Sequence, residues 1–240
     1  MPTITSRGGI PLAYAHRTGT GPTFVFLPGY MSDMEGGKAL AVDAWCAENG
    51  RACLRLDYSG CGASGGAFKD GTLTRWRDDV LDVIAAAAPE GPLVLIGSSM
   101  GGWLMLLVAL AIPERISALV GIAAAPDFTD WGFSDAQKAA FARGEDLVEP
   151  SAYSEEPYVT TAAFWRSGEA NRLLATPIPL TCPVRLLHGQ ADPDVPWSVS
   201  LRLAEALGSA DVQTLLVKDG DHRLSRPQDI ALLLRVIEDL

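Results

Sequence analysis

The chain has 240 residues, 48% hydrophobic and 20% charged, a composition typical of one globular domain with a sizeable core. Nineteen basic against 29 acidic residues give a net charge of −10. This charge repels nucleic acid backbones and anionic membrane surfaces, so we expect no nucleic acid partner and no membrane insertion. The four cysteines lack metal-ligand spacing, and the first 22 residues lack a signal or transit pattern. These features predict a cytoplasmic protein with reduced thiols.

Strand-like apolar runs alternate with helical patterns along most of the chain. The strand-like runs lie at 23–28, 51–58, 92–97, 116–125, 183–189 and 212–218, and the helical patterns at 36–48, 73–87, 102–111, 197–207 and 227–239. Such alternation predicts an α/β protein with a mostly parallel sheet flanked by helices. Ser225 and Gln228 have the spacing of a capping box, which predicts the start of the last helix.

The run from Gly91 to Ile112 carries no charge and reaches the length of a membrane span, about 20 residues. Glycines and serines interrupt it at 97–102, after the buried-strand pattern LVLI and before a stretch of good helix formers. We therefore predict a strand, a sharp turn and a helix in place of a membrane span.

The alternation stops between residues 127 and 176, where no strand-like run is found. Ser134 and Gln137 form a capping box that predicts a helix over 134–144, and the proline-rich connector TPIPLTCP follows later. We expect 127–176 to be a small helical cap, inserted between core segments 1–126 and 177–240. Eight of the 18 aromatic residues lie in it: Phe128, Trp131, Phe133, Phe141, Tyr153, Tyr158, Phe164 and Trp165.

The cap aromatics have two interpretations. They build the cap's own core, or they form an apolar lid over a binding site. Trp131 and Phe133 follow directly after a predicted sheet strand, so they are the candidates to bind substrate.

The segment GSSMG at 97–101 matches G-x-S-x-G, the nucleophile elbow, in which a serine occupies a strained turn between strand and helix. The residues two before and two after that serine must be small, because they crowd each other. Counted from Ser99 they are Gly97 and Gly101, whereas Ser98 would have Ile96 and a methionine there. Ser99 is therefore the predicted nucleophile and Ser98 a strand-end residue, with a non-catalytic tight turn as the alternative.

A serine nucleophile needs a base, which an acid must orient. His222 lies in the loop between the last strand and the last helix, at the carboxyl edge of the sheet where ligands bind in such folds. His16, in an N-terminal strand-like segment, and His188, at the end of a buried strand, fit structural roles better. His222 is the predicted base; the alternative is a surface histidine without a role.

The acid is expected in the loop after the strand at 183–189. Asp192 lies directly after this strand, and Asp194, further along the loop, is the alternative. The chain order Ser99, Asp192, His222 is that of the α/β-hydrolase fold. The oxyanion needs two backbone N–H donors, for which we predict Met100 and Tyr30. An exposed aromatic side chain is another possible reason for the tyrosine at position 30.

The chain resembles the α/β-hydrolase superfamily, in particular the mitochondrial acyl-protein thioesterase and acyl-glucuronide esterase branch of the abhydrolase-domain series. The matching stretches are FLPGY, LDYSGCGAS, GSSMGGWLM, SEE at 154–156, PVRLLHG with Asp192 and VPW, and DHR at 221–223. The resemblance implies the same triad and hydrolysis of acyl esters or thioesters, either small molecules or acylated proteins, without a cofactor or metal.

Other functions use the same residues. A carbon–carbon bond hydrolase or a perhydrolase of this fold would have the same triad. A catalytically silent binding protein is the alternative from another class, since a fold does not establish a function.

Overall fold

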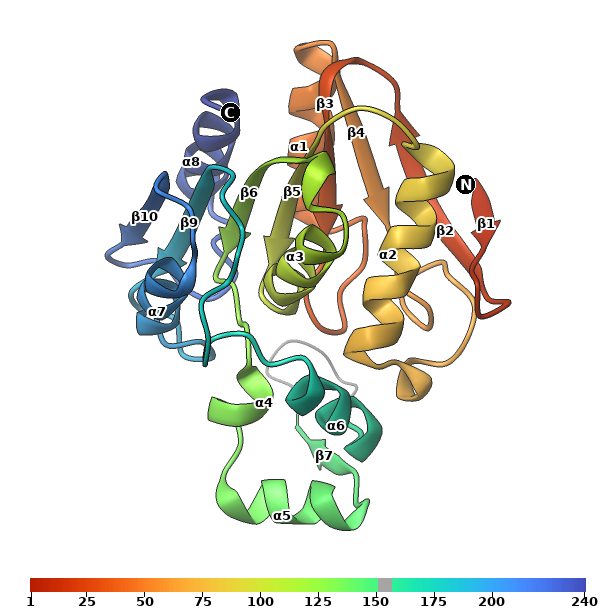
Figure 1. The fold of residues 1–240 in the computed structure, drawn as a ribbon, viewed down its shortest axis with the longest axis vertical. Coiled ribbons are helices and arrows are strands. Elements are labelled where there is room, and N and C mark those ends of the chain that lie inside the picture. Colours follow the sequence, from red (N-terminus) through yellow and green to blue (C-terminus); the bar gives the residue numbers. More distant parts are fainter. Residues whose placement is uncertain (151–156) are drawn as a thin grey trace.

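An eight-stranded sheet forms the centre of the computed structural model, which describes residues 1–150 and 157–240 (Figure 1). The strand order is β1-β2-β4-β3-β5-β6-β9-β10. Strands β1 and β2 pair antiparallel at one edge, and the other six run parallel. The strands are β1 (Thr3–Thr5), β2 (Pro11–Arg17), β3 (Thr20–Leu27), β4 (Arg51–Leu56), β5 (Leu93–Ser98), β6 (Ile116–Ile122), β9 (Val184–Gly189) and β10 (Val212–Val217).

Helices cover both faces of this sheet. Helices α1 (Gly37–Glu48) and α8 (Pro227–Glu238) pack on one face, and α2 (Leu73–Ala87), α3 (Met100–Ala111) and α7 (Ser198–Ala206) on the other. Successive strand side chains point to opposite faces, so Leu95 packs with the second group of helices and Ile96 with the first. Burial on both faces explains why the strands read as continuous apolar runs. Two short 3-10 helices, η1 (Phe68–Asp70) and η2 (Pro113–Arg115), lie in the connections before α2 and β6.

The predicted α/β architecture is confirmed. The uncharged run at 91–112 divides into β5 and the 12-residue helix α3. Within the two described ranges, no helix is both long and apolar enough to cross a bilayer. All four cysteines are free.

The last helix starts at Pro227, where the predicted helical pattern starts, but the predicted capping box of Ser225 with Gln228 is wrong. Arg226 is the N-cap of α8, and its backbone N–H donates to Asp229 at 3.1 Å. The Arg226 guanidinium bonds both Asp229 and Asp219, at 2.8 Å each, which favours this cap over Ser225 with Gln228. The Ser225 hydroxyl donates to the Arg223 carbonyl oxygen.

The segment after β6 leaves the sheet and lies beyond the carboxyl ends of the parallel strands (Figure 1). It contains α4 (Phe128–Trp131), α5 (Asp135–Arg143), β7 (Leu147–Glu149), β8 (Tyr158–Thr160) and α6 (Ala162–Ala170). The Ser134 and Gln137 capping box of α5 is confirmed. The expectation of no strand is wrong, because β7 and β8 pair antiparallel. Strands of three residues are too short to show a readable alternation. Tyr153 and the SEE stretch lie outside the described residues.

One buried carboxylate joins the two ends of this inserted segment. Asp127, at its start, has a left-handed backbone with φ 58°. Its carboxylate accepts the N–H groups of Leu173 and Leu174, both at 2.8 Å. Burial raises the pKa of Asp127, and the two backbone donors act in the opposite direction. The insertion therefore leaves and rejoins the core at one hydrogen-bonded point.

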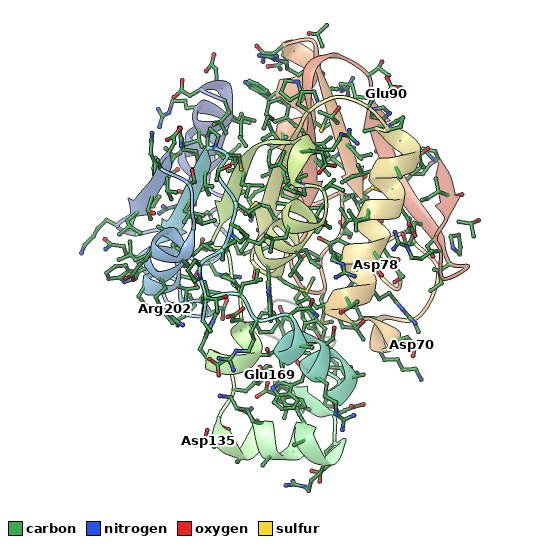
Figure 2. The ribbon with its side chains drawn as sticks, in the orientation of Figure 1. Asp70, Asp78, Glu90, Asp135, Glu169 and Arg202 are labelled. Carbon is green, nitrogen blue, oxygen red and sulfur yellow. The ribbon has the colours of Figure 1, made fainter. Side chains whose placement is uncertain are left out.

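Charged side chains lie around the outside of both the sheet region and the inserted segment (Figure 2). Asp78 projects from α2, Glu90 lies at the end of the molecule opposite the insertion, and Asp135 lies on α5 (Figure 2).

Candidate functional site

Ser99 lies in the turn between β5 and α3, with φ 54° and ψ −120°. A Cβ added to Gly97 would lie 2.3 Å from the Gly101 carbonyl oxygen, and one added to Gly101 would lie 2.1 Å from that of Leu27. Both positions therefore require glycine. A backbone of this kind costs about 1–3 kcal/mol and persists where the surroundings hold it. Here the Ser99 N–H donates to Ile122 at 2.9 Å.

The structure brings Ser99, Asp192 and His222 together. Nε2 of His222 lies 3.0 Å from Oγ of Ser99, and Nδ1 of His222 lies 2.8 Å from Oδ2 of Asp192. An ionised carboxylate can only accept, so Nδ1 carries the hydrogen and the Nε2 lone pair faces the serine hydroxyl. This is the tautomer that a general base requires.

Gly189 and Gly220 allow the loops that carry Asp192 and His222 to approach each other closely. A Cβ added to Gly189 would lie 2.1 Å from the Gly220 carbonyl oxygen, so the loops after β9 and β10 touch along their backbones. The Ala191 N–H donates to Gly220 at 3.0 Å and the Gln190 N–H to Val217 at 2.8 Å. These contacts place Asp192 beside His222, although 30 residues separate them.

Asp192 is held in its ionised form. Its side chain is fully buried, which disfavours the charge, but hydrogen bonds from His188, His222 and the Val195 N–H outweigh burial. The pKa of Asp192 consequently lies well below its usual range. The Asp194 and Val195 N–H groups donate to Oδ1 at 2.8 and 2.9 Å, which leaves Oδ2 for the histidine.

The alternative candidates take other positions in or around this site. Ser98 is the last residue of β5, and the exposed Asp194 contributes its N–H to Asp192. His16 lies on β2, away from Ser99. His188 is buried and bonds the Val195 carbonyl oxygen at 3.0 Å, as a structural histidine was expected to do, but it also approaches Asp192.

Tyr30 and Met100, the predicted oxyanion donors, flank Ser99. Met100 is the first residue of α3, where N–H groups have no acceptor within the helix. Tyr30 follows Gly29, at which an added Cβ would lie 3.4 Å from Cβ of Ser99. The Tyr30 side chain is half-buried, contrary to the expected exposure, and its hydroxyl donates to the Val159 carbonyl oxygen of β8 at 2.7 Å.

A cavity of about 550 Å³ opens over Ser99 and His222. Trp131 and Phe133, the candidates to bind substrate, both line it. The other lining residues from the inserted segment are Phe128, Gly132, Glu149, Tyr158 and Thr160. Tyr158 and Thr160 were not predicted to line the site because β8 was not predicted. Lys38, at the start of α1, also lines the cavity. No motif in the sequence around Lys38 predicted this position.

Among the described residues, Asp192, Asp194 and His222 have possible metal-ligand atoms within 4.8 Å of one another. Two of the three are already bonded to each other through Nδ1 and Oδ2. A metal ion there would compete with the hydrogen bond that orients the His222 ring.

Residues 22–146 match the α/β hydrolase fold family. Palmitoyl-protein thioesterase ABHD10, mitochondrial, from Mus musculus is 45% identical over 241 residues, which is 98% of this chain and 80% of that protein. The chain belongs to the α/β-hydrolase family. The solved structure of mouse α/beta hydrolase domain-containing protein 10 superposes with a TM-score of 0.91 at 42% identity, covering 99% of this chain and 96% of that one. The solved structure of an Agrobacterium vitis S4 protein superposes with a TM-score of 0.93 at 42% identity, covering 99% of this chain and 97% of that one.

These relatives confirm the predicted family and the class of enzyme, a hydrolase of ester or thioester bonds. The cytoplasmic location predicted for this α/β-hydrolase is wrong, because the mouse and human relatives are named mitochondrial. The expectation rested on a missing targeting pattern in the first residues, and such an absence does not identify a compartment.

Proposed function

We propose that this α/β-hydrolase cleaves carboxylic ester or thioester bonds through an acyl-enzyme, with Ser99 as nucleophile, His222 as base and Asp192 as orienting acid. The observation that carries the proposal is the chain of hydrogen bonds from Asp192 through His222 to Ser99, beside a cavity large enough for a substrate. Cavities of about 300–1,000 Å³ are typical of small-molecule sites.

The reaction takes two steps. Nε2 of His222 accepts the Ser99 proton as Oγ attacks the acyl carbon, and it then returns this proton to the departing oxygen or sulfur. Water, deprotonated by His222, next attacks the acyl-enzyme and releases the carboxylic acid and Ser99. Asp192 keeps the ring in the required tautomer and stabilises the imidazolium in both steps.

The oxyanion that forms in each step needs donors that are in place beforehand. We assign this role to the N–H groups of Tyr30 and Met100. The N-terminus of α3 favours negative charge at the same point, since its first amides and its dipole face the turn at Ser99.

We further propose that residues 127–176 are a cap that selects the acyl group. Phe128, Trp131 and Phe133 give its side of the cavity an apolar surface. The ABHD10 relatives are named palmitoyl-protein thioesterases, which agrees with an acyl group that has an apolar body. The substrate is then a small acyl ester or thioester, or an acylated protein.

Labelling with a fluorophosphonate tests the nucleophile. Ser99→Ala should abolish labelling and hydrolysis without unfolding the protein, and Ser98→Ala is the matched control that should retain both. Mass spectrometry of the labelled peptide identifies the modified serine. Label on Ser98, or label that persists in Ser99→Ala, would contradict the assignment. A panel of acyl esters and thioesters then defines the substrate class.

A further inference from the structure

His188 is a second histidine beside the carboxylate that bonds His222. It lies at the end of β9, and its side chain has no exposed surface. Its Nε2 lies 3.2 Å from Oδ2 of Asp192, the oxygen that also bonds Nδ1 of His222 at 2.8 Å. One carboxylate oxygen therefore faces two imidazole rings, and the mechanism above uses one of them.

The neighbours of His188 determine where its proton lies. Nε2 also lies 3.0 Å from the Val195 carbonyl oxygen, and neither this oxygen nor an ionised carboxylate can donate. Nε2 must therefore carry a hydrogen, which it donates to Val195, while Oδ2 of Asp192 lies 3.2 Å from the same nitrogen. Nδ1 lies 2.7 Å from the Ser200 hydroxyl, which can donate or accept and so suits the neutral or the charged ring.

The anchoring of His188 differs from that of His222. His188 belongs to a strand that is paired on both sides, with β6 and β10, and Ser200 of α7 holds the far side of its ring. His222 belongs to a loop. A ring fixed in the sheet can define the position of Oδ2 to which the loop histidine must adjust.

We propose that His188 is a positioning residue, which holds the Asp192 carboxylate in the rotamer that His222 needs and attracts part of its negative charge; this rests on the proposed function. Without the His188 N–H, more of the Asp192 charge acts on His222. His222 then keeps its proton to higher pH, and the acid limb of the kcat/KM profile moves to higher pH.

A histidine that merely fills the core predicts another result. Its loss would loosen Asp192, weaken the bond to His222, and leave the acid limb in place or move it to lower pH. The other charged groups that line the cavity or adjoin His222 in the sequence remain in every variant, so they do not determine the sign of the shift. They are Lys38 of α1, Glu149 of β7, and Asp33, Asp194, Asp221 and Arg223 of the loops.

The test compares three variants. His188→Leu removes the ring N–H, His188→Gln keeps an N–H donor, and Ser200→Ala changes the opposite side of the ring. We expect kcat/KM of His188→Leu to fall about tenfold to a hundredfold, as for loss of a hydrogen bond to a charged group, with its acid limb at higher pH. His188→Gln should recover most of the activity, and Ser200→Ala should keep the wild-type limb. The proposal would be overturned if the acid limb of the kcat/KM profile of His188→Leu stays in place or moves to lower pH.

Two measurements on the wild type complete the test. Fluorophosphonate labelling of Ser99 comes first, because its failure would contradict the proposed function and not the role of His188. The chain has three histidines, so the ring nitrogens can be assigned by ¹⁵N NMR. We expect a proton on Nε2 of His188 throughout the active pH range. An Nε2 without a proton would overturn the proposal even if His188→Leu does not fold.

Discussion

The carboxyl edge of the sheet and the proposed cap, residues 127–176, hold their side chains in different ways. At the sheet edge, backbone contacts fix each position: Gly97 lies against Gly101 and Gly189 against Gly220, with no space for a Cβ. In the cap, ring contacts hold the cavity wall, such as Phe128 with Phe133 at 6.3 Å between ring centroids. Backbone contacts of the first kind allow one arrangement, whereas packed rings tolerate exchange.

The difference separates chemistry from selectivity. A displacement of about 1 Å at the reacting atoms is costly, so the triad belongs on the rigid sheet. An apolar wall needs to exclude water and match a shape, which several aromatic arrangements can do. We therefore expect substitutions at the sheet edge to change kcat strongly, and substitutions in the cap to change the ranking of substrates.

The largest effect is expected for Asp192→Asn. Asparagine can present an N–H to Nδ1 of His222 and reverse its tautomer, so kcat should fall about 10⁴-fold with little change in KM. Steady-state kinetics measure this directly. Asp194→Asn is the matched control and should have a mild effect, because Nδ1 bonds Asp192. The reverse ranking would move the acid to position 194.

The pH profile of the wild type sharpens this prediction. The pKa of Asp192 lies well below its usual range, because donors from His188 and His222 outweigh burial. The stability that its charge contributes is therefore complete above an unfolded-state pKa of about 3.9, and is lost as the pH falls through the lower folded-state value. Activity lost between neutral and mildly acidic pH should accordingly be recovered on return to neutral pH.

The six parallel strands, and the position of Ser99, Asp192 and His222 at one edge of the sheet, could be predicted because local sequence patterns indicate both. Glycines mark the turn at 97–101, and the three residues follow three separate strands. The cap lacked such patterns: β7 and β8 have three residues each, and the bond from Tyr30 to Val159 joins positions 129 residues apart. Contacts of this kind depend on tertiary packing, which no local period shows.

The next largest effect concerns the junction of the cap. Asp127→Ala removes both acceptors for Leu173 and Leu174 and leaves a non-glycine residue at φ 58°. The N–H groups of Leu173 and Leu174, part-buried and left without an acceptor, should lower the free energy of unfolding by about 1–3 kcal/mol. Asp127→Asn, which keeps an acceptor and tolerates a left-handed backbone, should lose less. Thermal unfolding measures the loss.

Hydrogen exchange locates that loss. If the cap is a separate unit, the amides of 127–176 should exchange faster in Asp127→Ala while those of β5 and β6 stay protected. Equal loss of protection in both regions would mean that the cap and the sheet unfold as one unit.

Tyr30 lies where the two regions meet, so Tyr30→Phe tests whether they are independent. The substitution removes the 2.7 Å bond to Val159 and keeps the ring contacts with Phe68 and Phe164. Burial raises the pKa of Tyr30 far above its ordinary value, so the hydroxyl remains a donor throughout the assay range. Loss of one hydrogen bond should lower kcat about twofold to tenfold.

Acyl length distinguishes the two outcomes for Tyr30→Phe. If this bond positions the Tyr30 N–H for the oxyanion, the decrease in kcat should be the same for acetyl and for long acyl esters. A decrease confined to long acyl groups would show that the bond supports the cap wall and does not affect the oxyanion.

The smallest expected effect is the change in kcat/KM for each carbon added to the acyl chain. Each methylene buried in the cavity contributes about 0.8 kcal/mol, so kcat/KM should rise about threefold to fourfold per carbon until the cavity is full, provided the contact is kept in the transition state. Trp131 and Phe133 line the cavity, and Trp131 is held by a 2.8 Å bond from its indole N–H to the Pro126 carbonyl oxygen. Replacing both residues with alanine should flatten this rise and leave kcat/KM for an acetyl ester nearly unchanged.

Matched oxygen esters and thioesters of each length make this comparison independent of the leaving group. Phe141, which is fully buried and packs on Trp165 inside the cap, provides the control: Phe141→Leu should lower stability without changing the slope. If the wild-type profile is flat or falls from acetyl upward, and the double variant leaves it unaltered, the cap aromatics build only the core of their own subdomain. The acyl preference would then have to come from residues of the sheet edge, such as Val195, that also line the cavity.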